Sequence, residues 1–104
     1  MYGTIGHFRI KAGMEAQFRQ LMEGQGHAFE AAQIPGFVVS YGYHMDADSN
    51  DYYLAVVFES RETYWANAQS PKQDARYHQW LPLLEGEPEW HDGEIVGIYA
   101  LKED

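Results

Sequence analysis

The sequence predicts a single α+β domain whose strands and helices follow the order β-α-β-β-α-β around one antiparallel sheet. Two observations lead to this prediction. Apolar side chains recur at every second position in some segments and at helical spacing in the segments between them, and the two patterns alternate in that order. The chain has 104 residues, which is enough for one hydrophobic core and too few for two. We therefore assign residues 1–104 to one domain.

A strand and a long helix are expected first. Residues 2–10 alternate with a period of two, which is typical of a strand. Apolar side chains follow helical spacing through residues 14–32, and polar side chains lie opposite them: Glu15, Arg19, Glu23, Gln25 and Glu30. Gly24 and Gly26 weaken this helix by about 1 kcal/mol each relative to alanine, so we expect a bend or close packing there.

Two strands joined by a hairpin are expected next. Residues 37–45 alternate again, and residues 46–51 are rich in turn-forming side chains. Residues 52–58 are almost continuously apolar or aromatic, which is typical of a strand buried on both faces. We therefore expect this third strand to be central in the sheet.

The second helix is expected in two pieces, followed by the last strand. Ser60 has the character of an N-cap, and Ser70 followed by Pro71 gives a second helix start a few residues later. Residues 94–101 alternate and supply the last strand. The complete order is that of a ferredoxin-like domain.

Composition excludes several classes of partner and site. Sixteen acidic residues against seven basic ones give a formal charge of −9, which repels nucleic acid and anionic membranes. The chain has no cysteine, which fits a reducing compartment, and no apolar run near the ~20 residues that span a bilayer. We therefore expect a cytoplasmic protein. The five histidines show no metal-binding spacing, so we expect no metal.

Both faces of the predicted sheet are apolar. Right-handed crossovers place the helices on one face only, so the other face of a monomer should be polar. The alternating residues on either face of the strands are instead largely apolar, and large exposed apolar patches are uncommon. We expect a homodimer in which two sheets pack face to face. The alternative is a monomer with one tolerated apolar patch.

Several motifs resemble the antibiotic biosynthesis monooxygenase family over essentially the whole chain. They are residues 58–65 (FESRETYW), the Ser70-Pro71 helix start with its histidine, and the Ile34-Pro35-Gly36-Phe37 entry to a strand. The resemblance implies a dimeric α/β barrel with a pocket between each subunit's helices and sheet. It also implies oxygenation of phenols or quinols by dioxygen without any cofactor, because a deprotonated dihydroxy-aromatic can itself donate an electron to oxygen.

A branch of the same superfamily degrades haem, and it uses an Asn, a Trp and an axial His. An ungapped comparison puts Gly6, Asn67 and Tyr77 at those three positions, with Trp65 and His78 displaced. This mismatch argues against haem degradation, although a small insertion or deletion would restore part of the pattern.

The candidate catalytic residues are Asn67, His78, Asp74 and His7. Asn67 stands where the resemblance implies a polar pocket residue, and an amide can orient a phenolate or dioxygen. Asp74 precedes His78 by four residues, a spacing that suits either an acid–base pair or a solvated ion pair. His7 is either a base near the sheet or, like His44, an interface residue. The proton acceptor stays open among His7, Asp74 and His78.

Aromatic side chains are the candidate substrate-binding residues: Trp65, Tyr77, Tyr41, Tyr43, Phe8 and Trp80. Alternation places Tyr41 and Tyr43 on the strand face of Phe37, toward the helices if that face is the core side. The missing side chain of Gly6 is expected to leave space for a ligand beside Phe8. Each of these residues has core packing as its alternative role.

The sequence therefore favours a cofactor-independent monooxygenase acting on a small phenolic aromatic. The alternative is a noncatalytic ligand-binding or stress-response protein on the same barrel, because one fold hosts unrelated functions.

Overall fold

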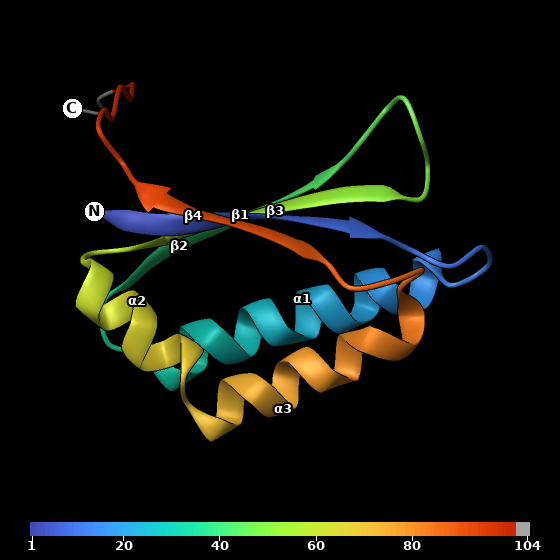
Figure 1. The fold of residues 1–104 in the computed structure, drawn as a ribbon, viewed down its shortest axis with the longest axis horizontal. Coiled ribbons are helices and arrows are strands. Elements are labelled where there is room, and N and C mark those ends of the chain that lie inside the picture. Colours follow the sequence, from blue (N-terminus) through green and yellow to red (C-terminus); the bar gives the residue numbers. More distant parts are fainter. Residues whose placement is uncertain (102–104) are drawn as a thin grey trace.

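A computed structural model describes residues 1–101 of the chain, except for the side chains of residues 29–32 (Figure 1). Residues 102–104 of the predicted domain lie outside the described residues. The elements are β1 (Tyr2–Arg9), α1 (Glu15–Ala32), β2 (Phe37–His44), β3 (Asp51–Phe58), α2 (Arg61–Ala68), α3 (Pro71–Trp80), the 3-10 turn η1 (Leu81–Leu83) and β4 (Glu89–Glu94). None of the described helices is both long and apolar enough to cross a bilayer.

The four strands form one antiparallel sheet in the order β2-β3-β1-β4. Figure 1 shows α1, α2 and α3 together on one face of this sheet. The predicted ferredoxin-like α+β fold is confirmed, with the nearly continuous apolar strand β3 at the centre as expected. The opposite face of the sheet, which we call the open face, carries no helix among the described elements.

The second helix is broken in two, as the sequence predicts, and serine caps both pieces. The Ser60 hydroxyl accepts a hydrogen bond from the Thr63 N–H, and the Thr63 side chain accepts one from the Ser60 backbone N–H. The Ser70 hydroxyl accepts from the Gln73 N–H, and Pro71 occupies the first turn, where its missing N–H costs nothing. The break lets α2 and α3 run in different directions over the sheet.

The predicted orientation of Tyr41 and Tyr43 is wrong. Phe37 pairs with Phe58 but Val39 pairs with Val57, so an irregularity between them shifts the alternation of β2 by one residue. Tyr41 and Tyr43 consequently lie on the open face, where they are 54% and 51% exposed. The residues that face the helices are Ser40, Gly42 and His44.

The predicted position of the last strand is also wrong. The strand that pairs with β1 is Glu89–Glu94, and only the Ile95 N–H continues toward the start of the chain, at Met1 O. The apolar alternation of residues 95–101 has no partner strand among the described residues, and most of its large side chains are exposed: Val96, Ile98, Tyr99 and Leu101. We call residues 95–101 the C-terminal arm. Because β4 is a polar edge strand, its residues show little apolar alternation.

The core is aromatic and lies between the sheet and helices α1 and α3. Its buried members are Phe8, Ile10, Phe18, Tyr52, Trp80 and Leu84. Phe8 is 1% exposed and contacts the rings of Phe18, Trp80 and Trp90. The space predicted beside Phe8 is absent, because a Cβ built on Gly6 would meet the Trp90 ring at 2.7 Å. Phe8 is therefore a core residue.

The glycines of α1 do not mark close packing. A Cβ built on Gly24 or Gly26 meets nothing within 4 Å, and α1 runs through both positions as one uninterrupted helix. The expectation of close packing there is wrong. Gly36 is the opposite case, because its φ of 79° is unfavourable for other residues and its added Cβ would lie 2.4 Å from Thr63.

We therefore predict opposite effects of alanine at two glycines. Gly36→Ala should lower the free energy of unfolding by about 2–4 kcal/mol, because it adds backbone strain and a clash with the α2 capping residue. Gly24→Ala should raise it by about 0.5–1 kcal/mol, since alanine is the better helix former. Urea denaturation measures both changes. Equal effects of the two substitutions would contradict this account of Gly36.

Candidate functional site

A cavity of about 920 Å³ lies between the helix-facing side of the sheet and the three helices. Eight aromatic side chains belong to its wall: Phe37, Tyr52, Phe58, Tyr64, Trp65, Tyr77, Trp80 and Trp90. An aromatic wall of this kind favours a flat, largely apolar ligand.

Five residues singled out from the sequence line this cavity together: Trp65, Asn67, Asp74, Tyr77 and Trp80. They come from α2 and α3, which the serine caps hold at the edge of the cavity. Among the described residues, the Asn67 amide makes only a long contact, 3.5 Å from its Nδ2 to Gln73 Oε1. Asn67 therefore keeps most of its hydrogen-bonding capacity for a ligand.

Other predicted site residues lie elsewhere. His78 does not line the cavity; its side chain is 62% exposed, and its ring sits 3.5 Å from the Asp74 carboxylate and 2.8 Å from the Asp74 carbonyl. The pair is thus a solvated contact within one helix turn. Tyr41 and Tyr43 are on the open face, and Phe8 is in the core.

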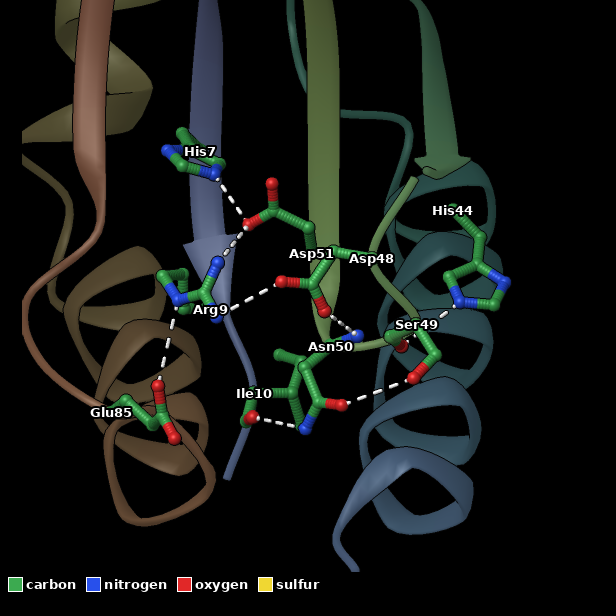
Figure 2. A network of polar contacts seen from close by, with 9 residues as sticks. All are labelled: His7, Arg9, Ile10, His44, Asp48, Ser49, Asn50, Asp51 and Glu85. Carbon is green, nitrogen blue, oxygen red and sulfur yellow. Dashed lines mark hydrogen bonds and ion pairs between the residues drawn. The ribbon is translucent and has the colours of Figure 1, made fainter. Parts of the chain in front are cut away.

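His7 also lies on the open face, away from the cavity. Its Nε2 is 2.7 Å from Asp51 Oδ1, and its ring stacks on Tyr53 with centroids 4.5 Å apart. Figure 2 shows Asp51 shared between His7 and Arg9, whose guanidinium also pairs with Asp48 and Glu85. This network ties β1 to the β2–β3 hairpin and to the turn after η1.

A backbone N–H and the Arg9 guanidinium both stabilise the charged form of Asp48 in this network. The pKa of Asp48 is held below its usual range, first by the hydrogen bond from the Asn50 N–H and then by Arg9. All of these groups belong to the strand ends and loops. They are structural contacts, and none of the three charged partners of Arg9 lines the cavity.

Sequence reasoning missed a polar cluster at the α2 side of the cavity. The Tyr64 hydroxyl donates to Asp92 Oδ1 at 2.8 Å, and Thr4 lies beside them with a buried hydroxyl that makes no hydrogen bond to any described residue. Burial raises the pKa of Tyr64 most, and the hydrogen bond to the Asp92 carboxylate raises it further. Asp92 was missed because the last strand was misplaced.

A second polar cluster was missed at the α1 side. Arg19 lies on the polar side of α1 in the sequence pattern, yet its side chain reaches the cavity and donates to the Tyr52 hydroxyl at 2.9 Å and to His44 Nδ1 at 2.6 Å. The shift in β2 turns His44 toward the helices and makes this contact. Helical periodicity alone gives no signal for such a long side chain bending over the flank.

The described residues contain no group of three or more His, Cys, Asp or Glu side chains arranged to hold a metal ion.

The indole N–H of Trp80 already has a hydrogen-bond partner at the core end of the cavity, because Trp80 Nε1 donates to Gln25 Oε1. Trp80 therefore contributes its ring face rather than a free donor.

We predict that the charge of Asp92 controls the ionisation of Tyr64. Asp92→Asn should lower the pKa of Tyr64, because the neutral amide no longer opposes the phenolate. Alkaline titration of tyrosinate absorbance measures this, with Tyr64→Phe in the same background identifying the signal.

Glu94→Gln is the matched control, since Glu94 is a carboxylate on the same strand outside the cavity, and it should leave the pKa of Tyr64 unchanged.

Folding raises the pKa of Tyr64. The protonated Tyr64 hydroxyl therefore makes its full contribution to the free energy of unfolding below the ordinary tyrosine pKa of 10.0, and this contribution is lost as the pH rises beyond that value. Tyr64→Phe should remove this alkaline loss. An unchanged Tyr64 titration in Asp92→Asn would contradict the assignment.

Comparisons with known proteins support the fold. No family model and no curated protein sequence matches the chain. Among solved structures, a candidate antibiotic biosynthesis monooxygenase from Deinococcus radiodurans aligns with a TM-score of 0.82 at 12% identity, covering 99% of this chain and 100% of that one. A second, from Chloroflexus aurantiacus, aligns with a TM-score of 0.73 at 21% identity, covering 97% and 98%.

A third similar structure has a named activity. SnoaB from Streptomyces nogalater, described as a cofactor-independent oxygenase and solved as a point mutant, aligns with a TM-score of 0.80 at 16% identity, covering 93% of this chain and 94% of that one. At these identities the likeness concerns the fold. The chain therefore has the fold of the antibiotic biosynthesis monooxygenases, as its sequence motifs indicate.

Proposed function

We propose that this protein is a cofactor-independent monooxygenase that oxidises a small phenolic or quinol-type aromatic with dioxygen. The observation that carries the proposal is the cavity, in which aromatic walls meet the predicted pocket residues Trp65, Asn67 and Tyr77. The named oxygenase activity of SnoaB, which has the same fold, supports the same chemistry. The proposal keeps the cytoplasmic location expected from the sequence.

The size of the cavity suits this class of substrate. Small-molecule sites commonly enclose about 300–1,000 Å³ and combine apolar walls with a few polar groups. A volume of about 920 Å³ accommodates a ring system of more than one ring, and the aromatic side chains offer faces for stacking. Polar groups stand at both sides of the cavity, so hydroxyls of such a ligand find partners.

The proposed reaction requires only a few functions of the protein. A phenol that loses its proton becomes an electron donor to dioxygen, and the protein must bind it, accept or release that proton and exclude water. Asn67 is the proposed group that orients the substrate oxygen or dioxygen, since its amide is nearly free. Of the three proton acceptors left open by the sequence, Asp74 lines the cavity, whereas His7 and His78 do not.

The first test is oxygen uptake by the purified protein with a panel of quinols and catechols, after spontaneous oxidation is subtracted. Saturable uptake is expected, and Asn67→Ala should lower kcat/KM by about 10–100-fold, because a preorganised hydrogen bond to developing charge is lost. Gln69→Ala, at the C-cap of α2 and outside the cavity, should keep the wild-type rate.

Absence of uptake across the panel would contradict the proposal. If the same compounds still bind with measurable affinity, the noncatalytic ligand-binding alternative would replace it.

We propose further that the protein is a homodimer joined through the open face. Exposed apolar and aromatic side chains support this, with Ile5, Tyr41 and Tyr43 on the open face and the C-terminal arm beside it. Large apolar patches of this kind are uncommon on monomers. In Figure 1 the arm leaves β4 and projects beyond the sheet, where a second copy can pair with it.

Sedimentation equilibrium tests this assembly. The wild-type mass should be twice that of the 12.0 kDa chain, and Ile5→Glu combined with Tyr43→Glu should give a folded monomer, because buried unpaired carboxylates are costly. The same charge placed on the helical side, by Gln69→Glu, should leave the dimer intact. A monomeric wild type would refute the assembly.

A further inference from the structure

Two arginines, Arg9 and Arg19, have opposite surroundings. Arg9 lies within 3.5 Å of three carboxylates, those of Asp48, Asp51 and Glu85, which neutralise its charge (Figure 2). Arg19 has no carboxylate within 4.0 Å among the described residues, although the chain has sixteen acidic side chains and a formal charge of −9. Arg19 therefore keeps a positive charge that no described carboxylate neutralises at short range.

Neutral acceptors hold Arg19 in place. Its Nε donates to the Tyr52 hydroxyl at 2.9 Å, and its Nη2 donates to His44 Nδ1 at 2.6 Å. A guanidinium only donates, so His44 Nδ1 must accept, and His44 Nε2 donates to the Ser49 carbonyl at 2.9 Å. Both ring nitrogens of His44 are thereby engaged in the neutral tautomer. Arg19 is fixed in direction while its positive charge stays uncompensated.

One of the two partners of Arg19, Tyr52, is buried, and the exposed His44 stacks on it. The His44 ring stacks on the Tyr52 ring with centroids 4.6 Å apart at 15°, and Tyr52 is 2% exposed. The Arg19 guanidinium lies 5.9 Å from the centroid of the same Tyr52 ring. A cation held on a buried aromatic platform is preorganised, so little conformational entropy is lost when an anion binds to it.

Arg19 is placed at the cavity, together with His44 and Tyr52, and it is the only lysine or arginine among the lining residues that the structure describes. The other titratable groups around the cavity are Glu23 and His27 on α1, Tyr64 on α2, Asp74 and Tyr77 on α3, and Asp92 on β4. None of their carboxylates pairs with Arg19 within 4.0 Å among the described residues. A guanidinium has five N–H donors, and the bonds to Tyr52 and His44 leave three for a ligand.

We infer that Arg19 binds the phenolate oxygen of the aromatic substrate, which makes it the residue that selects and stabilises the anionic form. The inference rests on the proposed function, and it adds the position of the reacting oxygen, which is next to Arg19. The hydroxyl O–H bond breaks, the proton passes to the carboxylate of Asp74, the acceptor that lines the cavity, and the electron pair remains on the oxygen that Arg19 holds. The phenolate is the form that donates an electron to dioxygen, so Arg19 raises its fraction at neutral pH.

This role also resolves an electrostatic difficulty. A chain of formal charge −9 repels anions at long range, and Glu23, Asp74 and Asp92 add negative charge at the cavity itself. Without a local cation the bound phenol would hold its proton more tightly than it does in water. A guanidinium at hydrogen-bond distance acts in the opposite direction and typically lowers the pKa of an acid beside it by about 1–3 units.

The test uses 2-naphthol, whose anion absorbs differently from its neutral form, under argon so that no oxidation interferes. We expect the pKa of bound 2-naphthol to lie about 1–2 units below that of the free compound in the wild type. Arg19→Met, which keeps much of the apolar stem, should return it to the free value or above, corresponding to a loss of about 10–100-fold in naphtholate affinity. Arg19→Lys should restore part of the pKa shift, because lysine keeps the positive charge but lacks the paired N–H donors of the guanidinium.

Two controls isolate the effect of Arg19. Arg61→Met removes a cation that lies over the Tyr2 ring and does not line the cavity, so the pKa of bound 2-naphthol should match that in the wild type. Naphthalene, which has no ionisable group, should bind wild type and Arg19→Met within about two-fold, since it depends only on the apolar walls. That match shows an intact cavity in Arg19→Met, and Arg19→Lys supplies the comparison if the methionine variant does not fold.

Three results would overturn the inference, and they separate it from the proposed function. Bound 2-naphthol with an unshifted pKa in the wild type, or an equal shift in wild type and Arg19→Met, would leave Arg19 a structural residue while oxygen uptake still stands. Failure of both 2-naphthol and naphthalene to bind the wild type would overturn the inference and the proposed function together.

Discussion

Helices cover one face of the four-stranded sheet only, and this one-sided cover determines most of what the protein can do. The covered face holds the aromatic core of Phe8, Phe18, Tyr52 and Trp80, which joins α1 and α3 to the central strands. The same face also forms one wall of the cavity. The stability of the fold and the shape of the candidate site thus depend on one packing interface.

Polar groups on the covered face are arranged in two separate clusters. Arg19, His44 and Tyr52 lie at the α1 side, and Tyr64, Asp92 and Thr4 lie at the α2 side. One cluster offers unused donors and positive charge, whereas the other offers a carboxylate and acceptor oxygens. The two sides of the cavity therefore differ in charge and in hydrogen-bonding character.

Because the helices cover only one face of the sheet, apolar side chains on the open face stay exposed to solvent. Tyr41, Tyr43 and Ile5 stay exposed there, and the C-terminal arm adds further apolar surface. Burial of such surface contributes about 25 cal/mol per Å², so a second copy that covers both would gain free energy that a monomer forgoes. The ion pairs of Arg9, Asp51 and His7 border this face and fix the strand ends next to it.

The resemblance to the monooxygenase family, and no periodicity, pointed to Trp65 and Asn67 as pocket residues, and both line the cavity. The sequence by itself determined the order of the elements, the central apolar strand and the broken second helix with its caps at Ser60 and Ser70. These features follow from local periodicity and capping, which neighbouring residues encode. Tertiary structure alone decided the face of Tyr41 and Tyr43, the place of β4, the filling of the space at Gly6 by Trp90, and the contact of Arg19 with His44. A one-residue irregularity in a strand moves every later side chain to the other face of the sheet. A polar edge strand is recognised only by the strand with which it pairs. A long side chain reaches groups that are far away in sequence. Such outcomes depend on pairings between distant segments, and local sequence patterns do not encode them.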